Sequence, residues 1–140
     1  MATPPRTLDH LNKVVVAYLD GRRLKGYVYN FSALRDSFHL LPQENPLQER
    51  GAEVALKDLK AVFFVKDFIG DREYRGRPIA EPPMHGRKIE VTFSDGENIF
   101  GKTEGYNPQK LGFFMFPADP ESNDLRIFVV NKNASRVRFV

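Results

Sequence analysis

Residues 13–42 decide the fold of this chain, and they read KVVVAYLDGRRLKGYVYNFSALRDSFHLLP. The same pattern returns at residues 88–117, as KIEVTFSDGENIFGKTEGYNPQKLGFFMFP, with no gap in an offset of 75 residues. The register continues to the C-terminus, so that residues 13–65 and 88–140 share 12 identical positions. Chance would give roughly three identities, which indicates that a unit of about fifty residues has been duplicated.

The sequence of each copy predicts five short β-strands. In the first copy, β-branched residues favour a strand over residues 13–19, and Asp20-Gly21 is typical of a tight hairpin turn with positive φ. Gly26, repeated as Gly101, suggests a bulge or a sharp bend in a small closed sheet. The other strands are expected over residues 23–31, 37–42, 53–56 and 60–65, with a 3₁₀ turn at residues 57–59.

This plan of five strands with a 3₁₀ turn resembles the SH3-like and Sm-like small barrels. The first Sm motif has a valine and an aromatic residue before Asp-Gly, then a glycine, an aromatic residue and a hydrophobic strand. The matching residues are Val16, Tyr18, Asp20, Gly21, Gly26, Phe31, Phe38 and Leu40, and in the second copy Val91, Phe93, Asp95, Gly96, Gly101, Tyr106, Phe113 and Met115. The resemblance implies an all-β protein of two tandem five-stranded Sm-like barrels, packed together, and the chain looks like a bacterial family of uncharacterised proteins.

The repeat also divides the chain. Residues 1–12 are expected to form a flexible lead-in, residues 13–65 the first barrel and residues 88–140 the second barrel. Residues 66–87 are expected to be an ordered connector, because their glycines and prolines exclude a long helix while apolar side chains can hold them in place.

The two copies differ most on the outer face of their first and last strands. Val15, Leu19 and Phe63 make this face apolar in copy one and define a candidate interaction patch, which we call the outer patch. A patch of this kind needs cover, either from the connector and the second barrel or from another subunit, so we expect a monomer or a homodimer. The positions compared on this outer face are Val15, Ala17, Leu19, Ala61 and Phe63 in copy one, and Glu90, Thr92, Ser94, Arg136 and Arg138 in copy two.

The sequence argues against an enzyme and predicts neither a cofactor nor a metal site. The chain has no cysteine, its three histidines (His10, His39 and His85) lie far apart, and the repeated Asp-Gly pairs are explained by turns. It carries no nucleophile-elbow, Walker-type or GxGxxG motif. No apolar run approaches the roughly 20 residues of a membrane span, and no signal peptide is evident, so a cytoplasmic protein is expected.

Basic residues offer a second line of interpretation. The net charge is +3, and the local basic excesses are candidate phosphate or nucleic-acid contacts. Sm-like proteins read RNA with an aspartate and an asparagine after the second strand and an Arg-Gly near the fourth. Copy one has Ser32 and Asp36 there, copy two has Asn107 and Leu111, and neither copy has the Arg-Gly. The basic candidates are Arg22, Arg23 and Lys25, followed by Arg72, Arg75 and Arg77.

Residues 26–40, GYVYNFSALRDSFHL, also resemble PilZ domains, which bind cyclic di-GMP through a D/N-x-S-x-x-G turn and an Arg-x-x-x-Arg stretch. Asn30 and Ser32 match the turn, but Arg35 stands where the glycine belongs and the arginine stretch is absent. We therefore expect a non-enzymatic binding or regulatory module that acts by protein–protein contact. Nucleic-acid binding and cyclic dinucleotide binding are the alternatives.

Overall fold

The computed structural model describes residues 11–29, 31–44, 46–47, 51–68, 86–119 and 121–140, and it is all-β, as predicted. The first half contains β1 (Asn12–Tyr18), β2 (Arg23–Val28), β3 (Ser37–Pro42), β4 (Ala52–Ala55), the 3₁₀ turn η2 (Leu56–Asp58) and β5 (Leu59–Val65). The second half contains β6 (Arg87–Phe93), β7 (Asn98–Thr103), β8 (Gly112–Pro117), β9 (Asp124–Val130), the 3₁₀ turn η3 (Asn131–Asn133) and β10 (Ala134–Phe139). No helix of the described residues is long and apolar enough to cross a membrane.

The 75-residue repeat of the sequence is also a repeat of the structure. Strands β1, β2 and β3 and turn η2 begin and end 75 residues before β6, β7, β8 and η3. Gly21 and Gly96 have φ angles of 94° and 92° in equivalent hairpin turns. In both turns the aspartate Oδ1 accepts a hydrogen bond of 3.0 Å from the backbone N–H two residues later. The repeated Asp-Gly pairs therefore serve the turns.

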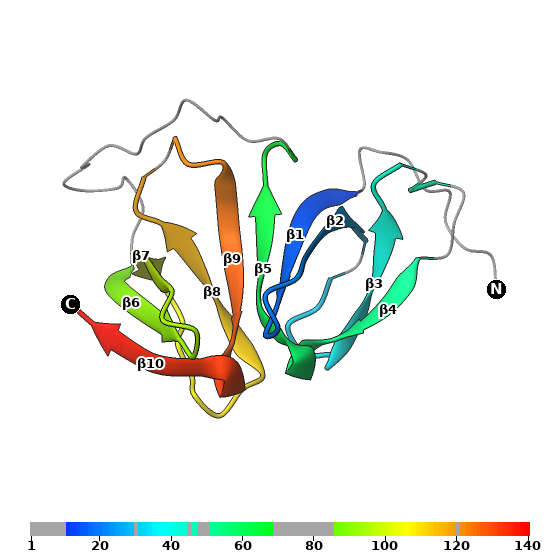
Figure 1. Ribbon diagram of the computed structural model, residues 1–140. Coiled ribbons are helices and arrows are strands. Elements are labelled where there is room, and N and C mark those ends of the chain that lie inside the picture. The colour runs from blue at the N-terminus through cyan, green and yellow to red at the C-terminus, as the bar shows by residue number, and fades with distance from the viewer. Residues whose placement is uncertain (1–10, 30, 45, 48–50, 69–85, 120) are drawn as a thin grey trace.

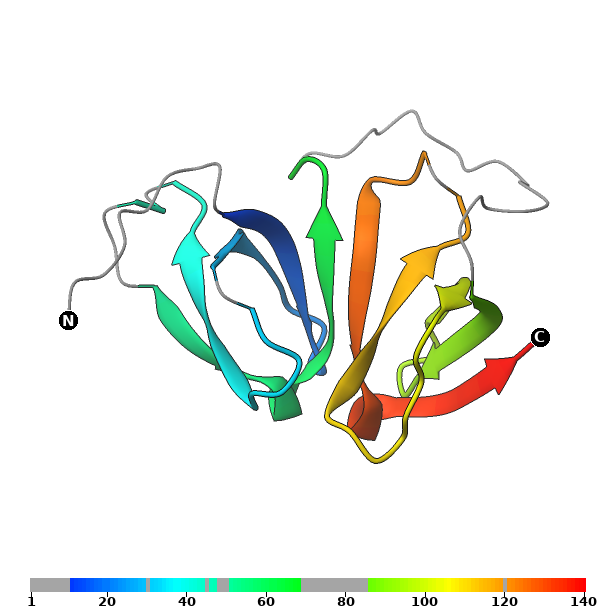
Figure 2. The same ribbon diagram turned by 180° about the vertical axis from the view of Figure 1, so that it is seen from behind.

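Strand pairing joins all ten strands in one antiparallel sheet, where the sequence predicted two five-stranded barrels packed together. The strand order is β10-β6-β7-β8-β9-β5-β1-β2-β3-β4, and the sheet is not closed. One edge of β5 pairs with β1 and the other with β9, so the halves are continuous through β5 and β9. Figure 1 shows the two curled halves side by side, with β5 (green) next to β9 (orange), and Figure 2 shows the same junction from behind.

The repeated glycines of β2 and β7 serve a different purpose from the predicted bulge. Neither Gly26 nor Gly101 has a positive φ, and the irregularities in strand register lie in other strands. A Cβ atom at Gly26 would collide with the carbonyl oxygen of Leu41, and one at Gly101 would collide with that of Phe116. Both positions need glycine because the neighbouring strand approaches so closely.

Two hydrophobic cores lie on opposite faces of the β5–β9 pair, which we call the seam. Val62 and Phe64 of β5, with Phe128 and Val130 of β9, point into the core of the first half. The other members of this core come from the first half, and they are Val14, Val16, Val28, Phe38, Leu40, Val54, Leu56 and Leu59. The first half thus needs two side chains of the second half to complete its core.

The second core repeats this exchange in the opposite direction. Ala61, Phe63 and Val65 of β5 pack with Ile127 and Val129 of β9 inside the second half. The remaining members of this core are Ala17 from β1 and Ile89, Val91, Phe93, Phe113 and Met115. All seven residues of β5 are buried, which explains its nearly continuous apolar sequence, LKAVFFV, because both faces of the strand are covered.

Polar contacts hold the seam at three places. The Nζ of Lys60, a residue only 4% exposed, lies 2.7 Å from the Oδ2 of Asp95 and 3.0 Å from the Oε2 of Glu97. At the η3 end, the Nδ2 of Asn133 donates to the carbonyl oxygens of Lys57 and Leu59 across the seam. At the opposite end, Asn123 exchanges hydrogen bonds with the backbone of Asp67.

The second half covers most of the outer patch. Phe63 is 7% exposed inside the second core, and Val15 is half-buried against the same core. Leu19 remains 41% exposed. Among the aromatic residues of the second half, Phe114 packs on the first core, whereas Phe100 is 54% exposed.

The predicted terminal and connecting segments are described only in part. Residues 1–10 of the expected lead-in lie outside the described residues, while Leu11 is buried and β1 begins at Asn12. Most of the expected connector, residues 69–85, also lies outside them. Phe68 packs edge-on against Tyr27, with 5.2 Å between ring centroids.

The different burial of Phe63 and Leu19, two residues of the outer patch, predicts that the same substitution changes the free energy of unfolding by different amounts. Phe63→Lys should lower the free energy of unfolding by more than about 3 kcal/mol, because it removes a core aromatic ring and buries a charge. Leu19→Lys is the control and should change the free energy of unfolding much less, by about 0.5 kcal/mol, because Leu19 is 41% exposed and belongs to neither core. Urea unfolding of both variants measures this, and equal losses would contradict the packing described here.

The Lys60 contact predicts an effect of pH. The hydrogen bond from Lys60 holds the pKa of Asp95 below its ordinary value, and the backbone N–H of Glu97 adds to this. The folded carboxyl binds its proton less readily than the unfolded one. It therefore stabilises the fold above about pH 4, and this contribution is lost as pH falls through the lower folded pKa.

Asp95→Asn should accordingly lower the Tm at neutral pH, and the difference from the wild type should shrink as the pH falls below about 4. The asparagine retains the Oδ1 acceptor of the turn but replaces the charged Oδ2 acceptor of Lys60 by an uncharged NH2 group. Asp58→Asn is the control, because within the described part of the chain the Asp58 carboxylate has no ion-pair partner. A Tm difference for Asp95→Asn that stays constant from neutral to acid pH would contradict the stabilising role of the contact between Lys60 and the Asp95 carboxylate.

Candidate functional site

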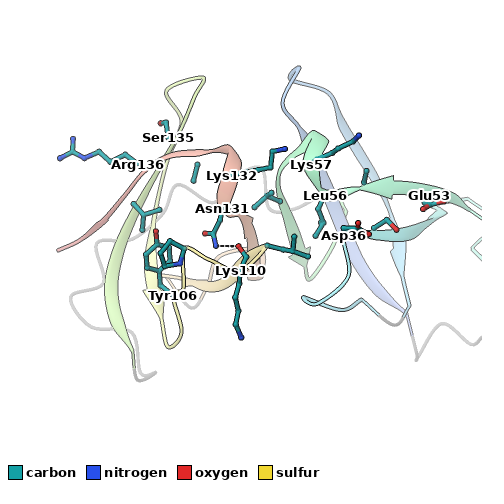
Figure 3. Close-up of a pocket in the computed structure, with 17 residues that line it drawn as sticks. Asp36, Glu53, Leu56, Lys57, Tyr106, Lys110, Asn131, Lys132, Ser135 and Arg136 are labelled. Carbon is teal, nitrogen blue, oxygen red and sulfur yellow. Dashed lines mark hydrogen bonds between the residues drawn. The ribbon is translucent and has the colours of Figure 1, made fainter.

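A groove of about 740 Å³ crosses the junction between the halves at the end where the two 3₁₀ turns lie (Figure 3). The first half contributes η2, the start of β3 and residues of β4. The second half contributes the loop between β7 and β8, the end of β9, η3 and the start of β10. The groove exists because the seam fixes these segments opposite one another.

Apolar side chains form part of the groove lining. Leu56 and Val130, each 2% exposed, belong to the first core and reach the groove surface. Leu111 is 41% exposed and adds apolar surface from the second half. Tyr106 also lines the groove, and its ring is held edge-on against Phe113 at a centroid distance of 4.9 Å.

Charged side chains of both signs surround this apolar lining. Two carboxylates and one lysine come from the first half, whereas three basic residues come from the second half. Figure 3 shows the two groups on opposite sides of the gap, with Arg136 reaching away from it. Among the described residues, none of the six forms an ion pair or a side-chain hydrogen bond. They are Asp36, Glu53 and Lys57, then Lys110, Lys132 and Arg136.

Backbone contacts hold both sides of the groove in place. The Nδ2 of Asn131 donates to the carbonyl oxygens of Asn107 and Lys110, at 2.8 and 2.9 Å, and so ties the β7–β8 loop to η3. The Oδ1 of Asn131 is buried and has no hydrogen-bond partner among the described residues. On the other side, the backbone N–H of Leu56 donates to the carbonyl oxygen of Asp36 at 2.9 Å. The charged side chains therefore project from ordered turns and strands.

Three of the basic residues predicted as phosphate contacts are described, and each of them lies outside this groove and has a partner. The guanidinium of Arg22 pairs with Asp20 at 2.8 Å, and hydrogen bonds from the backbone and side chain of Arg22 lower the pKa of that carboxyl. Arg23 lies 3.3 Å from Glu97. Lys25 donates to the carbonyl oxygen of Phe68 at 2.8 Å. Arg72, Arg75 and Arg77 lie outside the described residues.

The other sequence candidates are dispersed. Val15, Leu19 and Phe63 are not among the groove residues, and Phe63 is buried within the chain. Asn30, from the PilZ-like turn, lies outside the described residues, while the Oγ of Ser32 accepts a hydrogen bond from the backbone N–H of Leu34. Asp36 and Leu111, which occupy the RNA-reading asparagine position of the Sm pattern, both line the groove.

Sequence reasoning did not find the groove, although one signal was available. Lys57 and Lys132 are identical in the repeat, and both lie on 3₁₀ turns beside the groove. Their proximity depends on the pairing of β5 with β9, which the sequence pattern does not specify.

Ionisable groups with shifted pKa values also lie on β9, away from the groove. Burial raises the pKa of Asp124, and burial lowers the pKa of Arg126. The guanidinium of Arg126 lies over the rings of Phe64 and Phe114, 4.4 and 4.5 Å from their centroids, and so contacts both halves. Within the described residues, no group of three or more histidine, cysteine or acidic side chains is placed to hold a metal ion.

Comparison with known proteins gives one match. Residues 10–140 match a family of unknown function, DUF6982, so the match spans both halves and the segment between them. No curated protein and no solved structure matches the sequence. The chain therefore belongs to DUF6982, a family of unknown function.

Proposed function

We propose that the protein is a non-enzymatic binding module that holds an extended segment of a partner protein in the groove between its halves. The observation that carries this proposal is the groove itself, with an apolar lining and six charged side chains that no described residue pairs. Charged groups on ordered turns around apolar surface are suited to recognition, because few of them need to rearrange when a ligand binds.

The size and shape of the groove suit a peptide. Its volume of about 740 Å³ falls within the roughly 300 to 1,000 Å³ that is typical of ligand sites. An extended peptide presents alternate side chains to opposite sides, so it can place apolar groups on Leu56 and Leu111 while its polar groups meet the flanking charges. Residues of both halves would therefore contact the same ligand.

Three observations favour a protein over the nucleic-acid and cyclic dinucleotide alternatives. Asp36 and Glu53 place negative charge on one side of the groove, where a phosphate backbone would be repelled. Arg22, Arg23 and Lys25 already have partners, which a phosphate would have to replace. A cyclic dinucleotide is best bound by several guanidinium groups, and Arg136 is the one arginine among the described residues that line the groove.

We also propose that each half is a small Sm-like barrel and that the two arose by duplication. In each half the strands lie in the order fifth, first, second, third, fourth, with a 3₁₀ turn between the fourth and fifth. Each half curls around its own core, and that core is completed by a strand of the other half. The regular 75-residue spacing of the elements supports a common origin.

Selection of short random peptides on the immobilised protein tests the binding proposal. Ala55→Trp should block the groove, which Ala55 lines, whereas Ala52→Trp adds the same side chain to an exposed position of β4 outside it. Peptides enriched on the wild type should bind Ala55→Trp at least about tenfold more weakly, a loss of about 1.4 kcal/mol, and should bind Ala52→Trp unchanged.

Two results would contradict the proposal. One is that no peptide is enriched, or that the enriched peptides bind both tryptophan variants as tightly as the wild type. The other is that a pool of random single-stranded RNA, selected in parallel, binds in a way that Ala55→Trp abolishes while peptides do not.

A further inference from the structure

We propose, building on the function above, that the groove selects a partner segment whose charges are separated. A basic side chain of that segment lies toward Asp36 and Glu53, and an acidic side chain lies toward Lys110 and Lys132. The segment would therefore bind in one direction only.

The first half supplies the acidic end of the groove. Asp36 immediately precedes β3, and Glu53 lies on β4, which pairs with β3. Both side chains are exposed, and neither has an ion-pair partner among the described residues. Two carboxylates on the same side of the groove raise the local negative potential, which favours a lysine or arginine from a ligand.

The second half supplies the basic end. Lys110 lies in the β7–β8 loop that Asn131 anchors, and Lys132 lies on η3 itself. Both lysines are exposed, and in the described part of the chain both lack an ion-pair partner. A glutamate or aspartate of the ligand would supply the missing opposite charge.

The polarity arises from divergence between the two copies. In the 75-residue register Asp36 corresponds to Leu111, and Glu53 corresponds to Phe128. The carboxylates are therefore present on the first half alone, whereas Lys57 and Lys132 keep a lysine on both 3₁₀ turns. A groove between two identical copies would present the same charges at both ends.

Ligands with one sign of charge fit this arrangement poorly. A polyanion would meet Asp36 and Glu53, and a polycation would meet Lys57, Lys110 and Lys132. Because the seam fixes the two halves relative to each other, the ends cannot rearrange to bring like charges out of the way. A segment with separated charges satisfies both ends at once.

The test uses peptides enriched from the random pool on the wild-type protein. We expect them to carry both a basic and an acidic residue, separated by apolar positions. Asp36→Lys with Glu53→Lys, and separately Lys110→Glu with Lys132→Glu, should each weaken binding at least about tenfold. Asp58→Lys is the control, because it reverses an exposed carboxylate of η2 that does not line the groove, and it should leave binding unchanged.

Charge exchange on the peptide separates a direct effect from a loss of folding. A peptide whose basic residue is replaced by glutamate should bind the Asp36→Lys, Glu53→Lys protein better than the parent peptide does. If peptides bind in a way that Ala55→Trp blocks, but the charge variants have no effect or no rescue occurs, charge separation is wrong and groove binding stands. If Ala55→Trp also has no effect, or nothing is enriched, the proposed function itself fails and this inference fails with it.

Discussion

The pairing of β5 with β9 is the constraint on which the rest of the structure depends. These two strands are the boundary between the cores, and each face of the pair belongs to a different core. A unit of about fifty residues buries little apolar surface and is only marginally stable by itself, so each half gains stability by using side chains of the other. The buried Lys60 and its two carboxylate partners add a polar contact that fixes the register of the halves.

The same junction explains why the outer strands differ from the central ones. On β5 the positions of Ala61 and Phe63 face the second core, while the equivalent positions of β10 carry Arg136 and Arg138. Arg138 pairs with Glu90 at 2.8 Å on the neighbouring strand β6. Charged side chains of this kind protect an edge strand from further pairing, so the seam is built once within the chain and is not repeated at β10. The groove at this junction therefore has two ends that carry different charges.

Much of the fold could be predicted because local patterns fix it. The 75-residue register, the Asp-Gly turns and strand β3 follow from turn chemistry and from alternation within single segments. The apolar character of Phe63 on an outer face also indicated that something must cover it. The single continuous sheet could not be predicted. The apolar sequence of β5 shows that both of its faces are covered, but it does not identify the strand that pairs with its second edge. The groove was missed for the same reason. Asp36 and Lys132 are 96 positions apart in the sequence, and they line the same groove only because β5 pairs with β9.

The central claim is that the two halves form one cooperative unit through β5 and β9. The most direct measurement is urea unfolding, followed by circular dichroism, of residues 1–85 and 86–140 produced as separate chains, alone and mixed. We expect neither fragment to show a cooperative transition alone, and we expect the mixture to regain one, because each fragment lacks strands that complete its core. If residues 1–85 alone unfolded cooperatively and with the stability of the full chain, the shared seam would not be what holds this protein together.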